Sequence, residues 1–309
     1  MRSFALSLGL FFFGSACNSS GDHPDLGILP GDLSVGDAAP RDFASDGAAL
    51  ADMGLACTTI PGNVIISNNQ EWMTLVGGGC IIVGGQLQIS APGVTALSPV
   101  ANQIVSVGSL AITQNDALTS LSLPALKTVG GEVIVNNDDA LTSLNFPALT
   151  SVGGNFGANN LPVLMSVNLP VLASVGGNLN FIMDPALSSL GVPVLTTTHE
   201  IDIDTDPLLP TLSLPALQTT TGIIAIKTNS TLASVSAPLL ASSAGLYMIS
   251  NAALTSLTLP VLTTMSGDMT VQNNAALRQC LVDAVKTGLT TGPTAYTASG
   301  NNGMPNTCP

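Results

Sequence analysis

The residues best suited to chemistry lie in one short acidic run of the 309-residue chain. Residues 199–207 read HEIDIDTDP, so Glu200, Asp202, Asp204 and Asp206 alternate with other residues. Because side chains of a β-strand alternate between its two faces, a strand here would place these carboxylates on one outer face. Neighbours on that face are about 6.8 Å apart, too far for all four to bind one ion. The repeat described below places Asp204 beside Lys227, which predicts a surface ion pair between them. We interpret Glu200, Asp202 and Asp204 as candidate binding residues, and the alternative is a solvated acidic patch.

A second pair of carboxylates comes from the repeat described below. Asp184 and Asp206 lie 22 residues apart and occupy equivalent positions of neighbouring repeats. Calcium prefers oxygen ligands and takes six to eight of them. The pair is therefore the better candidate for a Ca²⁺ site, and the alternative is a solvated acidic surface without metal. No other cofactor is predicted.

The charged residues argue against catalysis. From Cys57 onward the cations are Lys127, Lys227, Arg278 and Lys286, and the histidine is His199. Polysaccharide lyases and hydrolases built as parallel β-helices need clustered carboxylates with Arg or Lys in a groove. The chain has no GxSxG, HExxH or P-loop motif. We expect no catalytic residues, with a polysaccharide-active enzyme as the remote alternative, and a net charge of -13 argues against nucleic acid as partner.

A repeat must position these residues. Prolines recur at intervals of 23, 23, 23, 22, 23 and 22 residues: Pro124, Pro147, Pro170, Pro193, Pro215, Pro238 and Pro260. Alternating apolar runs with the same spacing begin at Val64, Leu87, Leu110, Val133, Phe156, Leu179, Ile201, Ile224, Leu246 and Met269. One repeat is too small for a core of its own, so its apolar side chains must stack on those of its neighbours. The sequence predicts an all-β, right-handed parallel β-helix, or solenoid, of about ten coils.

A column of Asn and Asp supports the stacking. It lies five residues after most of the strand starts, at Asn69, Asn115, Asp138, Asp184, Asp206, Asn229, Asn251 and Asn274. These residue types tolerate left-handed backbone and bond to nearby main-chain groups. We therefore expect each of them to form the turn that ends its strand.

The motif of strand, Asn turn, LTSL, Pro-x-Leu and Val-Gly-Gly resembles the receptor L-domain type of leucine-rich β-solenoid. It covers residues 57–309, for example LTSLSLPALKTVGG at 118–131. That family includes growth-factor-receptor ectodomains, fungal cell-wall proteins and bacterial surface lipoproteins. The resemblance implies a ligand-binding role, but none of the motif residues is a ligand contact shared across the family.

The cysteine positions predict a disulfide bond at each end of the solenoid. Cys57 and Cys80 are 23 residues apart, which places them in one column of adjacent coils, about 5 Å apart and within disulfide range. Cys280 falls in the final coil, and Cys308 is the partner left for it. Residues 277–289 place Leu277, Leu281, Val282, Val285 and Leu289 near one helical face, which predicts a helical cap at the C-terminal end.

The first residues predict export. An apolar stretch at residues 3–16 follows Arg2 and ends in small residues, as in a secretory signal. It resembles a bacterial lipoprotein signal because Cys17 follows directly, although Gly14 stands where Leu is usual. The alternative is ordinary cleavage that leaves Cys17 a free thiol. Residues 17–56 contain seven Asp among scattered Gly and Pro, typical of a disordered acidic tether.

Together these features predict a lipid-anchored surface protein that performs no reaction. Asn18 follows Cys17, whereas Asp there would resemble an inner-membrane retention signal of Gram-negative bacteria. We therefore expect the outer membrane or cell surface as the address. The expected partner is a protein or an envelope polymer, bound for adhesion, ligand capture or envelope organisation. The alternative is a structural spacer without a specific ligand.

Overall fold

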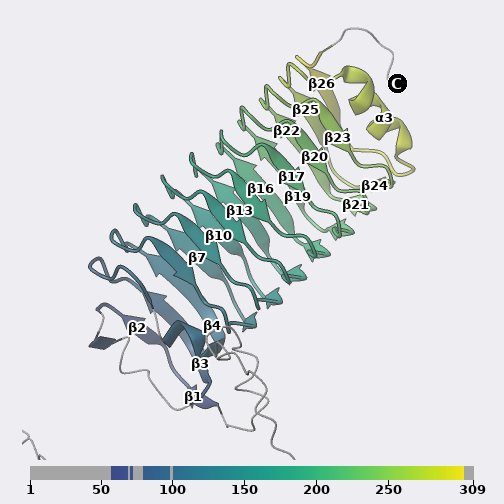
Figure 1. The fold of residues 1–309 in the computed structure, drawn as a ribbon. Coiled ribbons are helices and arrows are strands. Elements are labelled where there is room, and N and C mark those ends of the chain that lie inside the picture. The colour runs from purple at the N-terminus through teal and green to yellow at the C-terminus, as the bar shows by residue number, and fades with distance from the viewer. Residues whose placement is uncertain (1–56, 69, 72–78, 98–99, 303–309) are drawn as a thin grey trace, which may run out of the picture. The chain divides into compact units, whose positions relative to one another are not determined.

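A computed structural model describes residues 57–68, 70–71, 79–97 and 100–302 of the chain. The predicted signal and tether, with Cys17, lie outside the described residues, as do Asn69 and Cys308. Within the described part, the strands pair in parallel with the strands of the next coil (Figure 1). The all-β parallel solenoid is confirmed.

The main column of strands runs the length of the solenoid. It consists of β2 (Val64–Ile66), β3 (Ile81–Ile89), β4 (Ile104–Thr113), β7 (Val133–Asn136), β10 (Phe156–Asn159), β13 (Asn178–Ile182), β16 (Glu200–Asp204), β19 (Ile223–Lys227), β22 (Gly245–Ile249), β25 (Met269–Gln272) and β26 (Tyr296–Ser299). The predicted strand starts pair with one another in register, from Val64 with Leu87 to Leu246 with Met269. The structure adds β26 after them, with Tyr296 in the same column as Met269.

Shorter strands complete each coil. One column holds β1 (Thr58–Ile60), β6 (Thr128–Val129), β9 (Ser151–Val152), β12 (Ser174–Val175), β15 (Thr197–Thr198), β18 (Thr219–Thr220), β21 (Ser242–Ser243) and β24 (Thr264–Met265). Another holds β5 (Ser120–Ser122), β8 (Ser143–Asn145), β11 (Ser166–Asn168) and β14 (Ser189–Gly191), then β17 (Thr211–Ser213), β20 (Ser234–Ser236) and β23 (Ser256–Thr258). This last column is divided into separate sheets between β14 and β17. A 3-10 turn, η1 (Val100–Asn102), precedes β4.

The core fills the inside of the coils with aliphatic side chains, as the repeat predicts. Aromatic rings add volume at the middle coils, where Phe146, Phe156 and Phe181 are fully buried with ring centroids 6.1 Å apart from one to the next. The Val-Gly-Gly corner needs glycine because the coils approach closely there. A β-carbon on Gly153 would overlap the main-chain oxygen of Gly130 in the preceding coil.

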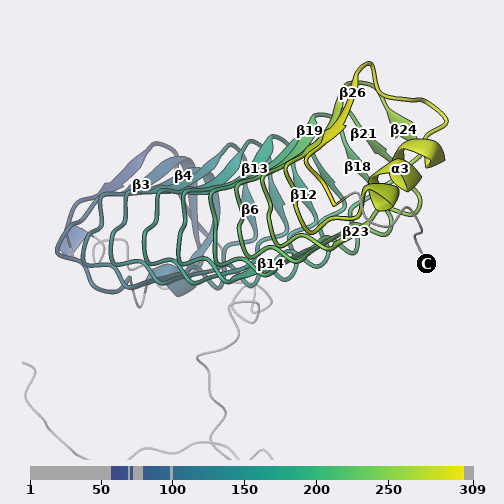
Figure 2. The same ribbon diagram turned by 90° about the horizontal axis from the view of Figure 1, so that it is seen from above.

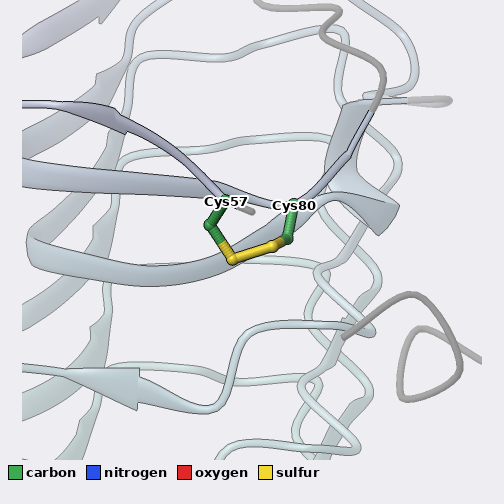
Figure 3. The surroundings of a disulfide bond; sticks show 2 residues. All are labelled: Cys57 and Cys80. Carbon is green, nitrogen blue, oxygen red and sulfur yellow. A yellow bond between two sulfur atoms is a disulfide. The ribbon is translucent and has the colours of Figure 1, made fainter. Parts of the chain in front are cut away.

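The first coils of the stack carry a disulfide bond, and its C-terminal end carries a helix. Cys57 and Cys80 form the predicted disulfide, with Cα atoms 4.5 Å apart (Figure 3). The helix α3 (Gln279–Gly288) lies at the C-terminal end of the stack (Figure 2) and buries Val282 and Val285. The helical cap is confirmed, whereas its predicted bridge from Cys280 involves Cys308, outside the described residues. Lys286 on α3 packs 4.2 Å from the ring centroid of Tyr296.

Candidate functional site

The acidic run forms β16, but only part of it reaches the surface. Glu200, Asp202 and Asp204 are half-buried on the outer face of the strand, and Ile201 and Ile203 point into the core. The expectation that Asp206 shares this face is wrong, because Asp206 is fully buried. Thr205 between them has a left-handed backbone, with φ of 63°, which breaks the alternation of the strand and turns Asp206 inward.

Lys227 on β19 neutralises part of this outer face. Its Nζ lies 3.2 Å from Asp202 Oδ1 and 3.2 Å from Asp204 Oδ2. Burial disfavours the charged ammonium, but hydrogen bonds and charge from both carboxylates outweigh it and raise the pKa of Lys227. The predicted pairing with Asp204 is confirmed, and the contact with Asp202 is additional.

Further polar groups border the ion pair. Asn178 Nδ2 on β13 donates to Glu200 Oε2 at 3.4 Å, and the Thr205 hydroxyl donates to Asp204 Oδ1 at 2.9 Å. On the other side, Ala225 of β19 pairs in register with Asp202, and Tyr247 of β22 pairs with Ala225. Tyr247 therefore lies in the Asp202 column, two coils away. We name Glu200, Asp202, Asp204, Lys227 and Tyr247 the polar patch. It offers hydrogen-bond acceptors and one aromatic ring.

The polar patch coincides with an irregularity of the solenoid. The short-strand column is interrupted between β14 and β17, which lie before and after β16 in the chain. Sequence alone locates the acidic run but not this interruption. The proline spacing of 22 residues between Pro193 and Pro215 does not mark it, because the same spacing between Pro238 and Pro260 spans the continuous pairing of β20 with β23.

The Asn and Asp column lies inside the solenoid and not on its surface. Its described members are all fully buried: Asn115, Asp138, Asp184, Asp206, Asn229, Asn251 and Asn274. Each of them begins the expected turn, because its carbonyl accepts the N–H of the residue three positions later, as Asn115 does from Leu118. None of them adopts the left-handed conformation that Asn and Asp tolerate. That conformation belongs to the residue before each of them, with φ between 55° and 63°: Gln114, Asn137, Met183, Thr205, Thr228, Ser250 and Asn273. Asn160 has it too, before Leu161, which takes the place of Asn or Asp in its coil.

Each member of this column bonds to the coil before it, so we call it the ladder. Asp206 Oδ1 accepts the N–H of Asp184 at 2.9 Å, and Asn229 Oδ1 accepts the N–H of Asp206 at 2.8 Å. The sequence missed the last member, Asn301, which accepts the N–H of Asn274 at 3.2 Å. It lies five residues after Tyr296, so the missing signal was the unrecognised strand β26.

The geometry of Asp184 and Asp206 suits hydrogen bonding better than calcium. One oxygen of each carboxyl is already taken by a main-chain N–H, from Leu161 for Asp184 and from Asp184 for Asp206. Among the residues described, no three His, Cys, Asp or Glu side chains are grouped to hold a metal ion. The pair thus falls short of the six to eight oxygens that Ca²⁺ takes, and a calcium site here stays a prediction.

A groove of about 560 Å³ runs along the glycine corner. It follows successive coils past Gly84, Gly108, Gly130, Gly153 and Gly176. None of the described residues that line it is titratable. The groove follows from the close approach of the coils and offers no group for acid–base chemistry.

Comparisons with known proteins identified no related family: no family model matches the chain, and neither a curated protein nor a solved structure does. The solenoid therefore rests on the structure itself, and the resemblance to receptor L-domains stays a prediction. No helix within the described ranges is both long and apolar enough to cross a membrane.

Proposed function

We propose that this chain is an exported, lipid-anchored binding protein of a bacterial envelope, and that its polar patch contacts a protein or an envelope polymer without catalysing a reaction. One observation carries the proposal. Four of the charged side chains between residues 186 and 267 lie in one seven-residue stretch, 200–206, and Lys227 is the other. Three of those four, with Lys227, gather on one outer face.

The surrounding surface makes this concentration informative. Neighbouring coils present no carboxylate at the positions that Asp202 and Asp204 occupy on β16. Gly, Asn, Ala, Tyr and Thr stand in the first of these columns, and Asn, Ile, Lys and Gln in the second. A solenoid that only spaces other parts does not require an ion pair at one particular coil, whereas a binding surface needs a place where the repeat is broken. The resemblance to receptor L-domains supports the same role, and the segment Gly14–Cys17 supports lipid anchoring.

The chemistry of the polar patch indicates the kind of partner. Three carboxylates and one ammonium leave an excess of acceptors, and Tyr247 adds an aromatic ring in the Asp202 column, two coils further along. Hydroxyl groups of a glycan or cationic side chains of a protein would both supply the matching donors. The proposal commits to contact at this patch and leaves these two sources for experiment.

The test is capture of a partner from the organism's own envelope with the tagged chain, and its loss on changing the patch. We expect the variant Glu200→Gln, Asp202→Asn, Asp204→Asn to retain much less partner than the native chain. The matched control Asp116→Asn, Asp139→Asn changes exposed carboxylates elsewhere on the solenoid and should retain it. Equal capture by all three forms, or no partner at any salt concentration, contradicts the proposal and favours the spacer.

A further inference from the structure

The ladder contains two residue types that are chemically different but occupy one column. Each buried asparagine accepts a main-chain N–H through Oδ1 and donates through Nδ2 to a strand carbonyl of the preceding coil. These donor bonds are Asn115 to Ile89 at 3.1 Å, Asn229 to Ile203 at 3.0 Å, Asn251 to Ile226 at 2.8 Å and Asn274 to Met248 at 2.8 Å. An amide suits the position because it carries both an acceptor and a donor.

The buried aspartates reproduce only the first of these bonds. Oδ1 accepts a main-chain N–H from Asn115 at Asp138, from Leu161 at Asp184 and from Asp184 at Asp206, at 2.7, 2.8 and 2.9 Å. The other oxygen, Oδ2, is buried without a hydrogen-bond partner in all three. It stands where asparagine has its donor nitrogen.

The strand register identifies what each Oδ2 faces. The carbonyls that receive the asparagine donors belong to one column of the main sheet, which includes Ile89, Ile203, Ile226 and Met248. The same column contains Ile112, Ala158 and Phe181, in the coils that precede Asp138, Asp184 and Asp206. An ionised carboxylate would therefore place its buried Oδ2, an acceptor, against a carbonyl oxygen, which is also an acceptor. Such an arrangement is costly.

We propose that Asp138, Asp184 and Asp206 are neutral carboxylic acids in the folded protein, and that each donates its Oδ2 proton to the main-chain oxygen of Ile112, Ala158 and Phe181, respectively. The proton gives aspartic acid the same acceptor and donor that asparagine has. The ladder then continues through both residue types with its hydrogen bonds satisfied. The folded solenoid consequently keeps these three carboxyl protons as hydrogen-bond donors.

Electrostatics agrees with this geometry. Burial raises the pKa of Asp184 to about 7 and that of Asp206 to about 8, against the lowering effect of the N–H bond that each accepts. The negative charges of Asp204 and Asp202 raise the pKa of Asp206 further, and an ionised Asp184 would add to this effect. Lys227 is the nearby cation, and it is engaged by Asp202 and Asp204.

Asp138 behaves in the same way in an earlier coil. Burial raises its pKa, hydrogen bonds from Asn115 lower it, and the neighbouring charges of Asp116 and Asp139 raise it. The two neighbours are exposed, so their effect is screened by solvent.

A proton fits this position better than a metal ion does. Ca²⁺ takes six to eight oxygen ligands, whereas Oδ2 and one strand carbonyl would supply two of them. The asparagines of the same ladder span the equivalent gap with single bonds of 2.8 to 3.1 Å. That spacing leaves room for one hydrogen bond.

The consequence is a solenoid that is most stable in acid. The carboxyl pKa values are raised above their ordinary value of 3.8, to about 7 and about 8 for Asp184 and Asp206. The folded state therefore holds protons that the unfolded chain has released. Their contribution to stability is fully present below pH 3.8 and is lost as the pH rises through the folded values.

The experiment compares melting temperatures from about pH 5 to about pH 9. We expect the native chain to lose several degrees over this range. The variant Asp184→Asn, Asp206→Asn should lose much less, because an amide keeps both bonds without titrating. The matched control Glu200→Gln removes a carboxylate from the surface of the same coil that is not among the charges raising the pKa of Asp206, and it should follow the native chain.

Infrared spectroscopy of the native chain gives a readout that does not depend on a variant folding. At about pH 6 the spectrum should contain the carbonyl band of protonated carboxylic acids, and it should vanish on raising the pH. Absence of that band overturns the proposal, as does an identical pH course for the native chain and the double variant. A rise in melting temperature with Ca²⁺, seen in the native chain but not in the double variant, also overturns it in favour of an ion.

Discussion

Asp204 and Asp206 are two residues apart in one coil, yet they occupy opposite environments. Asp204 lies on the outer face, 3.2 Å from Lys227, where water and a cation support its charge. Asp206 is fully buried among main-chain groups and lies beside Asp184 in the ladder. The left-handed residue Thr205 separates them. The comparison shows that one backbone conformation decides whether a carboxylate lies on the outer face of the solenoid or is buried in the ladder.

The substitution Asn229→Leu tests how much the buried ladder contributes to stability, and it has the largest expected effect. Leu161 shows that the ladder column accommodates leucine. The variant leaves the N–H of Asp206 and the carbonyl of Ile203 without their partners. We expect the free energy of unfolding to fall by about 2–3 kcal/mol, measured by urea denaturation. A loss below about 0.5 kcal/mol would show that the ladder bonds contribute little.

The sequence predicted the solenoid because its signal is repeated ten times. Spacing alone aligned Val64 through Met269 correctly, and it also paired Cys57 with Cys80. It failed where the repeat ends, since the helix α3 interrupts the spacing before Tyr296 begins one more strand.

The candidate site was harder to predict because it depends on single backbone angles. Strict alternation placed Asp206 outside with Asp204, and it gave no sign that the residue before the ladder takes the left-handed conformation. Sequence identified Lys227 as a partner of Asp204 from the register of coils. It could not show that the long Lys side chain also reaches Asp202, since rotamers decide this.

The substitution Thr228→Asn is expected to relieve backbone strain in the turn that, one coil after Thr205, separates the outer face from the ladder. Thr228 is exposed and has φ of 60°, a conformation that is strained for a β-branched residue. Asparagine occupies the same turn position at Asn137, Asn160 and Asn273. We expect stabilisation of about 0.5–1 kcal/mol by thermal denaturation. The control Ser230→Asn lies outside the left-handed position and should change stability little; equal gains from both variants would contradict the strain argument.

The substitution Lys227→Met tests how much the ion pairs of the outer face contribute to stability, and it has the smallest expected effect. Its side chain is 32% exposed, so the two contacts with Asp202 and Asp204 are screened by solvent. We expect a loss of less than about 1 kcal/mol at low salt, and a smaller one at high salt. The pKa of Lys227 is raised, so this contribution persists until the pH exceeds the ordinary lysine value of 10.5, well above the range in which the ladder loses protons. Lys127→Met, at an exposed lysine in another coil, serves as control in urea denaturation. A loss from Lys227→Met as large as that from Asn229→Leu would mean that the polar patch holds the fold together, and its carboxylates would then no longer be free to serve a partner.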